Sequence, residues 1–459
     1  MVTAAPGRTG RGPRVAIETQ GCKLNLADSE LLAQDFAAAG FAVVPAGQPT
    51  DVYILNTCTV THVADGKARQ KLRAARRRFP GALVVATGCY PARDRADLEA
   101  MDEVDLVMDN AEKPAIADAV AQRLLSAPLT VLQAADLPPR APFPSHHTRA
   151  FIKIQEGCND HCAYCIIPKT RGASRFFDAN AIVAAVSQRV AAGYREVVLT
   201  GTQLGDYGIA QPGSRRDDAD LRDQGSEGDP LAALLRRVLA ETGVQRLRVS
   251  SLQPQDMTPR LLDAWADARL CRHFHLPLQA GAGPVLRAMR RRYTQAEFLA
   301  SVDRIRTAYP DASITSDLIV GFPGERDEDF AASLDVCRAA RFAGVHVFPY
   351  SPRPHTLAER AAADPALAVP DGRKQQRLQA AMDVATGLQT AHLARFVGDC
   401  RPVLWEGAQR DGDGAPRWSG LTDNYLRVTV VSDRLQGGDI AMTRLVATDG
   451  TTLTGELAG

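Results

Sequence analysis

The sequence has no long apolar run and no excess of charge of either sign. No stretch of about 20 apolar residues, the length of a membrane-spanning helix, occurs among the 459 residues. The opening segment MVTAAPGRTGRGPRVAIETQ also lacks the apolar core of a signal peptide. Lys and Arg number 54 against 53 Asp and Glu, so bulk charge gives no argument for nucleic acid or membrane binding. We therefore expect a cytoplasmic protein, in which any nucleic-acid site is a local patch.

The sequence also lacks the even cysteine count of a disulfide framework. Its nine cysteines are an odd number, and thiols stay reduced in the cytosol. Clustered cysteines in such a chain are typical of metal ligands or catalytic groups. The length allows two to four domains at roughly 100–200 residues each.

One segment, QEGCNDHCAYCIIP, places Cys158, Cys162 and Cys165 within eight positions. Structural zinc normally takes four ligands, and the candidate for a fourth, His161, has little freedom between two of the cysteines. An iron–sulfur cluster usually takes four cysteines, so three leave one iron open to a non-protein ligand. A ferredoxin-like carrier would normally supply the fourth cysteine nearby. The spacing therefore favours a cluster that does chemistry, with zinc and an electron carrier as the alternatives.

Residues 150–350 alternate short apolar strands with amphipathic helical patterns, which predicts a parallel sheet of the partial TIM-barrel kind. Active sites of such barrels lie at the carboxyl ends of the strands, and the three-cysteine loop follows the first strand. Glycine-rich turns, which let a ligand approach the backbone, follow three others. The expected strands are FIKIQEG, EVVLTGT, RLRVSSL, HFHLPLQ, SITSDLIVGF and GVHVFPYS.

The N-terminal third repeats this arrangement. The predicted strands VAIET, VYILNT and LVVATG are followed by Cys22, Cys58 and Cys89. Because an open parallel sheet binds ligands at its carboxyl edge, these three cysteines can meet there. Buried core cysteines are the alternative, but these three follow the strands instead of lying inside them. We interpret them as a second three-ligand cluster site.

The predicted fold class is thus α/β with three parts. An open parallel α/β domain covers 14–125, a proline-rich linker 126–148, a partial TIM-like barrel 149–392 and a small antiparallel β-barrel 393–459.

Two basic segments and one aromatic are candidates for RNA contact. Clustered Arg and Lys hold phosphates without sequence preference, and an aromatic ring can stack on a base. The alternatives are a solvated helix face for the cations and core packing for the ring. The candidates are Lys71, Arg76, Arg77, Arg291, Arg292 and Tyr425.

Taken together, these segments resemble the radical S-adenosylmethionine methylthiotransferases, over nearly the whole chain. The resemblance rests on ETQGCKLN, NTCTVT, TGCY, GCNDHCAYCIIPKTRG, LTGTQLGDYG, SSLQP, HLPLQAGAGPVLRAMRRRYT, DLIVGFPGE and HVFPYSPR. It implies two [4Fe-4S] clusters, a radical cluster on Cys158, Cys162 and Cys165 and an auxiliary one on Cys22, Cys58 and Cys89. It also implies S-adenosylmethionine as radical source and methyl donor, in a site shaped by Tyr164, Gly201, Gln203, Val320 and Gly321. The last domain resembles TRAM, an RNA-binding module.

Within the family, the segments around Cys22, Cys58 and HVFPYSPR most resemble the branch that modifies threonylcarbamoyladenosine 37 of tRNA. The resemblance then implies tRNA as substrate, an electron donor such as flavodoxin or ferredoxin, and a sulfur donor. Branches acting on isopentenyladenosine or on a ribosomal-protein aspartate are alternatives, as is a non-catalytic RNA-binding carrier or sensor. One departure is His355, where the family usually has glycine.

Overall fold

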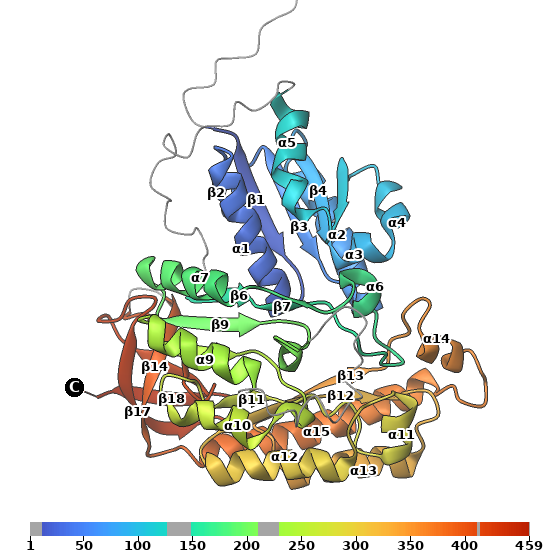
Figure 1. The fold of residues 1–459 in the computed structure, drawn as a ribbon, viewed down its shortest axis with the longest axis vertical. Coiled ribbons are helices and arrows are strands. Elements are labelled where there is room, and N and C mark those ends of the chain that lie inside the picture. Colours follow the sequence, from blue (N-terminus) through green and yellow to red (C-terminus); the bar gives the residue numbers. More distant parts are fainter. Residues whose placement is uncertain (1–11, 126–147, 210–228, 411–413, 459) are drawn as a thin grey trace, which may run out of the picture. The chain divides into compact units, whose positions relative to one another are not determined.

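The computed structural model describes residues 12–125, 148–209, 229–410 and 414–458 (Figure 1). The chain divides into two compact units. The N-terminal unit comprises residues 1–146 together with Lys169–Arg171, and the C-terminal unit comprises 147–168 and 172–459. The predicted linker lies almost entirely outside the described residues. Within the described ranges, no helix is both long and apolar enough to cross a membrane.

The N-terminal unit is built on a five-stranded parallel sheet in the order β2-β1-β3-β4-β5. Alternate residues of β3 point to opposite faces: Ile54 joins a core with Leu32 and Phe36 of α1, and Leu55 joins one with Leu72 of α2. Both faces are covered, which is why the strands carry apolar residues at consecutive positions, as in the first four residues of β3. The strands are β1 (Arg14–Thr19), β2 (Ala42–Val44), β3 (Val52–Thr57), β4 (Leu83–Gly88) and β5 (Leu106–Asp109). The helices are α1 (Lys23–Ala38), α2 (His62–Arg78), α3 (Cys89–Arg93), α4 (Arg95–Glu99) and α5 (Ile116–Leu125).

The strand order decides which side chains meet. β1, β3 and β4 are neighbours, and Cys22, Cys58 and Cys89 follow them in that order. Parallel neighbours end at the same edge, so the predicted common edge for these cysteines is confirmed.

The C-terminal unit contains all six strands expected between residues 150 and 350. They form two three-stranded parallel sheets, β10-β9-β6 and β11-β12-β13. The strands are β6 (Arg149–Lys153), β9 (Glu196–Thr200), β10 (Arg246–Val249), β11 (His273–His275), β12 (Ser313–Val320) and β13 (Gly344–Pro349), with the hairpin β7 (Gln155–Glu156) and β8 (Arg175–Phe176). The helices are α7 (Ala179–Ala191), α9 (Pro230–Glu241), α10 (Pro259–Leu262), α11 (Gly283–Ala288), α12 (Gln295–Ala308), α13 (Asp327–Ala340), α14 (Leu357–Ala362) and α15 (Asp371–Ala394). A short helix, α6 (Ile167–Arg171), ends in the three residues that belong to the N-terminal unit.

The small C-terminal barrel is closed, in the order β14-β15-β16-β18-β17. It is not wholly antiparallel as predicted, because β16 and β18 pair in parallel. Trp405, Val428 and Leu445 fill its interior. The strands are β14 (Cys400–Gln409), β15 (Arg417–Thr422), β16 (Arg427–Val431), β17 (Ile440–Thr448) and β18 (Leu453–Leu457).

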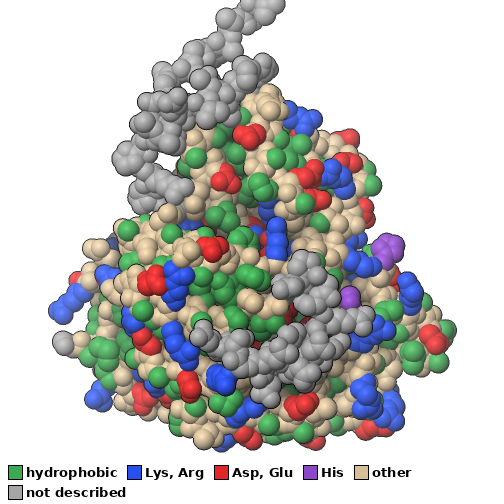
Figure 2. Space-filling model, viewed as in Figure 1, with side chains coloured by type: hydrophobic (Ala, Val, Ile, Leu, Met, Phe, Trp, Pro, Cys, Tyr) green, Lys and Arg blue, Asp and Glu red, His purple; other side chains and the backbone are tan. Residues whose placement is uncertain are grey.

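A fully buried ion pair attaches this barrel to the central sheet. Glu196 on β9 contacts Arg246 and Arg248 on β10 at 2.8 and 2.9 Å. Arg246 also donates to the carbonyls of Leu421 and Thr422 on β15. Burial alone would raise the pKa of Glu196, but the two guanidinium groups outweigh it and lower that pKa to about 2. On the outer surface, Figure 2 shows charges of both signs intermixed on the visible face.

Candidate functional site

The three-cysteine loop begins with a tight turn at Gly157, directly after β7. Gly157 has φ 76°, and a Cβ there would overlap the carbonyl of Ala173. The amide of Cys158 donates to the carbonyl of Gly172 at 3.2 Å. Glycine is therefore required for the backbone conformation and for the close approach of the two segments.

Other contacts hold the middle of the loop. The amide of Ala163 donates to the carbonyl of Met289 at 3.0 Å, and its carbonyl accepts from the amide of Ala358 at 2.8 Å. Arg292 forms a 2.7 Å ion pair with Asp160. The segment that carried the predicted RNA patch RAMRRRY thus packs against the cysteine loop.

The thiols receive hydrogen bonds from the protein. The amide of Asp160 donates to Sγ of Cys158 at 3.4 Å, and Nη1 of Arg291 donates to Sγ of Cys162 at 3.3 Å. Burial raises the pKa of Cys158 above its usual range and that of Cys165 to about 12. Bound iron would overcome this burial effect, because a coordinated thiol is deprotonated. In the part of the chain that the structure describes, no three His, Cys, Asp or Glu side chains are grouped to hold a single metal ion.

Arg291 begins a buried polar chain that leads away from Cys162. Its Nη2 donates to Oε1 of Gln253, whose Nε2 donates to Oε1 of Gln203 at 3.2 Å. Nε2 of Gln203 is buried and has no hydrogen-bond partner among the described residues. A buried donor left open in this way fits a polar ligand such as the S-adenosylmethionine implied by the resemblance.

Gln155, the first residue of β7, joins the turn that contains Thr202 and Gln203 to the start of the cysteine loop. Its Oε1 accepts from the amides of Thr202 and Gln203 at 2.9 and 2.8 Å, and its Nε2 donates to the carbonyl of Gly157 at 2.8 Å. Sequence analysis missed Gln155 and Gln253. In the sequence, the only signal for Gln155 was that a polar residue stands one position before the end of a strand.

The other predicted cofactor positions lie at the expected strand ends. Tyr164 is packed edge-to-face on Phe322, with ring centroids 6.3 Å apart. A Cβ at Gly201 would lie 2.7 Å from the Leu204 side chain. Gly321 follows the buried Val320 with φ 72°, and its amide donates to Glu325 at 2.6 Å. Their roles in cofactor binding stay predictions.

In the N-terminal unit, left-handed glycines precede two of the three cysteines. Gly21 has φ 106°, and a Cβ there would lie 2.9 Å from Sγ of Cys58. Gly88, before Cys89, has φ 104°, and a Cβ there would lie 2.5 Å from the carbonyl oxygen of Thr57. The missing side chain of Gly21 leaves room for the Cys58 sulfur, and that of Gly88 lets the backbone approach Thr57 closely.

The three thiols of this edge influence one another. Burial, with smaller contributions from the Cys22 and Cys89 thiols, raises the pKa of Cys58 to about 12. Desolvation of the thiol by surrounding protein raises the pKa of Cys22 above its usual value, although Arg171 and the amides that begin α1 act in the opposite direction. Cys22 is exposed, whereas Cys58 and Cys89 are buried. Three soft sulfur donors and a nearby cation fit an iron–sulfur cluster with one iron left open.

The structure separates the candidate RNA-contacting residues into distinct environments. Lys71 pairs with Glu18, Arg76 contacts Asp105 at 2.5 Å, and Arg77 is exposed. Arg291 donates to Cys162 and Arg292 pairs with Asp160, so both side chains turn to loop residues, and their contact with RNA stays a prediction.

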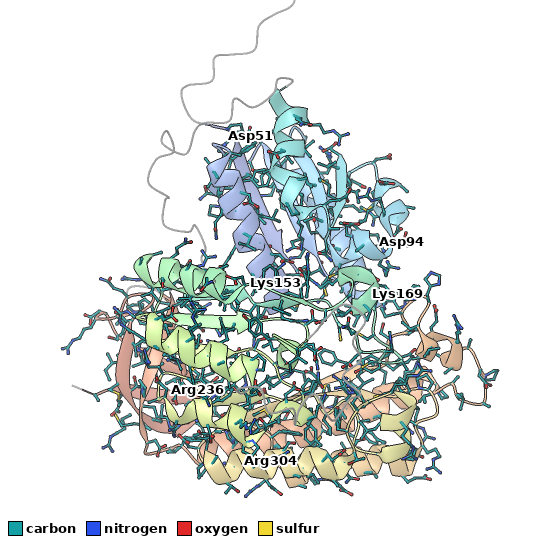
Figure 3. The ribbon with its side chains drawn as sticks, viewed as in Figure 1. Asp51, Asp94, Lys153, Lys169, Arg236 and Arg304 are labelled. Atoms are coloured by element: carbon teal, nitrogen blue, oxygen red, sulfur yellow. The ribbon has the colours of Figure 1, made fainter. Side chains whose placement is uncertain are left out.

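The ring of Tyr425 stacks on His273 with centroids 4.3 Å apart, and Arg248 lies 4.9 Å from its centre. This arrangement favours the packing alternative for Tyr425. Lys153, at the end of β6, and Lys169 are further cations near the loop in sequence (Figure 3).

Two comparisons with known proteins bear on these sites. Residues 14–109 match the family described as Uncharacterized protein family UPF0004, and residues 152–337 match the Radical SAM superfamily. A tRNA-2-methylthio-N(6)-dimethylallyladenosine synthase from Sorangium cellulosum is 36% identical over 90% of this chain and 86% of its own. The threonylcarbamoyladenosine tRNA methylthiotransferase MtaB of Bacillus subtilis is 33% identical over 90% of this chain and 89% of its own.

The chain belongs to the radical SAM methylthiotransferase family. It is therefore an enzyme, a transferase, and the alternative of a non-catalytic carrier is set aside. Membership in this family implies S-adenosylmethionine and a [4Fe-4S] cluster. Among solved structures, the radical S-adenosylmethionine methyltransferase TsrM from Kitasatospora setae shares the fold, with a TM-score of 0.52 at 15% identity. That match covers 76% of this chain and 77% of TsrM.

Proposed function

We propose that this methylthiotransferase converts threonylcarbamoyladenosine 37 of tRNA to its 2-methylthio derivative, using two [4Fe-4S] clusters. The observation that carries the proposal is the pair of three-cysteine sets, each at the carboxyl ends of parallel strands. Each set leaves one iron open, one for cleaving S-adenosylmethionine and one for holding sulfur.

At the first set, the residues position the cofactor and control the charge. Cys158, Cys162 and Cys165 would hold the cluster, which when bound supplies the electron that cleaves S-adenosylmethionine to a radical. Arg291 donates to Cys162 and so stabilises its thiolate, since a hydrogen bond from a charged donor is stronger than a neutral one. Gln203 offers its open N–H to the cofactor.

At the second set, Cys22, Cys58 and Cys89 would hold the auxiliary cluster, which when bound supplies sulfur to C2 of the adenine. Gly21 keeps the space beside the Cys58 thiol free of a side chain, and Gly88 lets the turn before Cys89 approach the backbone of Thr57 closely. Cys22 is the residue preceding α1, so its sulfur lies at the positive end of a 16-residue helix. This position favours the thiolate that iron requires.

The choice of substrate rests on the motifs that resemble one branch. In HVFPYSPR, His346 and Phe348 are both exposed on the same face of β13, which supports a contact with substrate. Relatives of both tRNA branches are similarly close, so isopentenyladenosine (dimethylallyladenosine) is the second candidate. A ribosomal-protein aspartate is the third. An electron donor such as flavodoxin or ferredoxin and a sulfur donor complete the proposed reaction.

The decisive experiment is mass spectrometry of tRNA nucleosides from a strain lacking this gene. We expect loss of 2-methylthio-threonylcarbamoyladenosine and accumulation of its unthiolated precursor. Complementation with Cys89→Ala should fail, whereas Cys400→Ala, at an exposed cysteine outside both sets, should restore the mark. Loss of the isopentenyl-derived mark instead would show that the branch assignment is wrong. An unchanged set of tRNA marks would refute a tRNA substrate.

A second measurement tests the first cluster alone. The reduced enzyme should release 5′-deoxyadenosine from S-adenosylmethionine, and Cys162→Ala should abolish the release. Cys89→Ala should retain it, because that residue belongs to the other set.

A further inference from the structure

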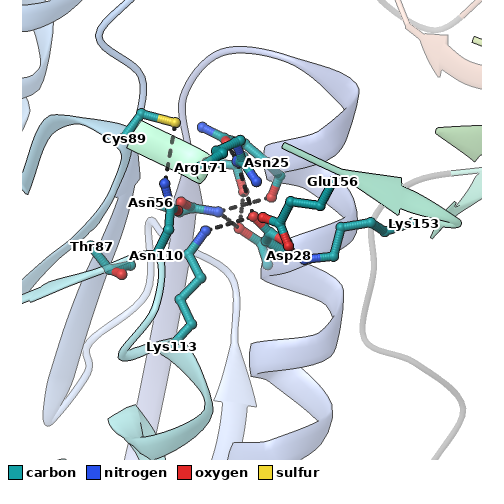
Figure 4. Close-up of polar contacts among 12 residues, drawn as sticks. Asn25, Asp28, Asn56, Thr87, Cys89, Asn110, Lys113, Lys153, Glu156 and Arg171 are labelled. Carbon is teal, nitrogen blue, oxygen red and sulfur yellow. Dashed lines mark hydrogen bonds and ion pairs between the residues drawn. The ribbon is translucent and has the colours of Figure 1, made fainter. Parts of the chain in front are cut away.

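The edge of the N-terminal sheet holds buried charges that the proposed cysteine ligands do not explain. Nζ of Lys113 lies 2.6 Å and Nη2 of Arg171 lies 3.1 Å from the same oxygen, Oδ2 of Asp28 (Figure 4). The Asp28 and Arg171 side chains are 2% and 1% exposed. Two cationic side chains thus share one carboxylate in a place where charge is costly, and burial lowers the pKa of Lys113 from its usual value.

A hydrogen-bond network connects this cluster to the edge that carries the cysteines. Arg171 also donates to Oδ1 of Asn25 at 2.5 Å, and the side chain of Asn25 is fixed by its bond to the carbonyl of Thr57, the residue before Cys58. These contacts lie inside one unit and hold the guanidinium group of Arg171 near this edge.

Asn110 adds a hydrogen bond to the same edge. It follows β5, the strand beside β4, and its Nδ2 lies 3.5 Å from Sγ of Cys89 and 2.8 Å from the carbonyl of Thr170. An amide nitrogen carries two N–H groups, so both bonds can form together. Its Oδ1 is buried and has no hydrogen-bond partner within the described residues. The contact with Thr170 therefore aims the amide N–H at the sulfur.

We propose that Asn110, together with Arg171 and Lys113 on Asp28, raises the reduction potential of the auxiliary cluster. Hydrogen bonds to the sulfurs and nearby positive charge both stabilise the added electron of a reduced iron–sulfur cluster. These are positioning residues: Asn110 acts through its hydrogen bond to Cys89, and Arg171 through the charge that Asn25 holds beside the backbone of Thr57. The inference rests on the proposed function, because it requires a cluster at Cys22, Cys58 and Cys89.

The test uses the full chain with Cys158, Cys162 and Cys165 changed to alanine, so that only the auxiliary site can load iron. EPR-monitored potentiometry of this protein gives the reference potential. Asn110→Leu, of similar size but without a donor, and Arg171→Gln should each lower the potential. For Arg171→Gln we expect the ratio of reduced to oxidised cluster at a given potential to fall roughly tenfold, about 59 mV for one electron.

Two matched variants separate this effect from a structural one. Arg171→Lys keeps the charge and should restore most of the potential. Arg123→Gln removes a charge from an exposed position on α5 of the same unit and should leave the potential unchanged. Iron and sulfide contents are measured for every variant, so that only fully loaded proteins are compared.

Fully loaded Asn110→Leu and Arg171→Gln proteins with the reference potential would overturn the proposal. If Arg171→Gln does not load iron, Asn110→Leu alone decides, since it removes one hydrogen bond and no charge. If the reference protein itself loads no cluster, the proposed auxiliary cluster is wrong, a failure distinct from an unchanged potential.

Discussion

Replacing Gly88 by alanine should damage the auxiliary site without touching a ligand. Gly88 has φ 104° and ψ −149°, a backbone conformation that only glycine adopts readily. The strain of such a conformation for another residue is about 1–3 kcal/mol. The new Cβ would also lie 2.5 Å from the carbonyl oxygen and 2.7 Å from the amide nitrogen of Thr57. Backbone atoms in a sheet cannot move aside easily, so overpacking adds roughly another 1–3 kcal/mol.

We therefore expect Gly88→Ala to destabilise the β3–β4 edge by about 2–6 kcal/mol in total. Hydrogen-exchange mass spectrometry of peptides covering β3 and β4 reports this local stability, and iron analysis reports loading of Cys89. The variant should exchange faster at this edge and lose the iron of one cluster, while 5′-deoxyadenosine formation persists.

Gly66→Ala is the matched control. Gly66 lies inside α2 of the same unit, and a Cβ there would meet nothing within 4 Å. Alanine should stabilise this helix by roughly 0.5–1 kcal/mol, because glycine is a poor helix former. Parent-like exchange and iron content in Gly88→Ala would refute the reasoning.

Three further predictions concern the C-terminal unit. Glu196→Gln leaves Arg248 buried without its carboxylate and should lower the free energy of unfolding in urea by about 3–5 kcal/mol. In the parent, the pKa of Glu196 is lowered to about 2, so the stability from this group should be lost as pH falls from 4.5 towards 2. A parent stability that stays constant in this pH window would contradict the assignment. Burial and neighbouring arginines lower the pKa of His392 to about 4, below its usual 6.5. The folded state therefore binds fewer protons than the unfolded state, and stability should fall as pH drops from 6.5 to 4. His392→Gln should remove this dependence of stability on pH, which urea midpoints across the same range will show. His355 has φ 64°, which explains why the family usually has glycine at this position. His355→Gly should raise the free energy of unfolding by about 1 kcal/mol in the same urea assay. A lower urea midpoint in this variant would count against backbone strain at His355.

Local sequence patterns were sufficient for the elements and for the cysteines. Continuous apolar runs predicted the parallel strands, since strands covered on both faces need apolar residues at every position. The cysteines follow those strands, and the carboxyl-edge rule then brought Cys22, Cys58 and Cys89 together. That rule depends on connectivity alone, which the order of strands and helices along the chain already contains.

The partners of the polar side chains were decided by tertiary structure. In the sequence, Arg291 and Arg292 belong to a basic segment that has the pattern of a surface patch. In the structure, Arg291 contacts Cys162, which is 129 positions away, and Arg292 contacts Asp160. A charge run has the same local pattern whether it faces solvent or a buried loop, and only packing distinguishes the two cases. The parallel pairing of β16 and β18 in the small barrel is another such result.

The surroundings of the cysteines show most clearly which features the sequence determines and which depend on the fold. The sequence by itself determined that three thiols follow three strands of one parallel sheet. Only the fold placed Asn110 beside Cys89 and Arg171 on Asp28, 143 positions earlier. The physical reason is that a ligand's position follows from short-range backbone periodicity, whereas its hydrogen bonds and nearby charges depend on segments that meet only after the chain has packed.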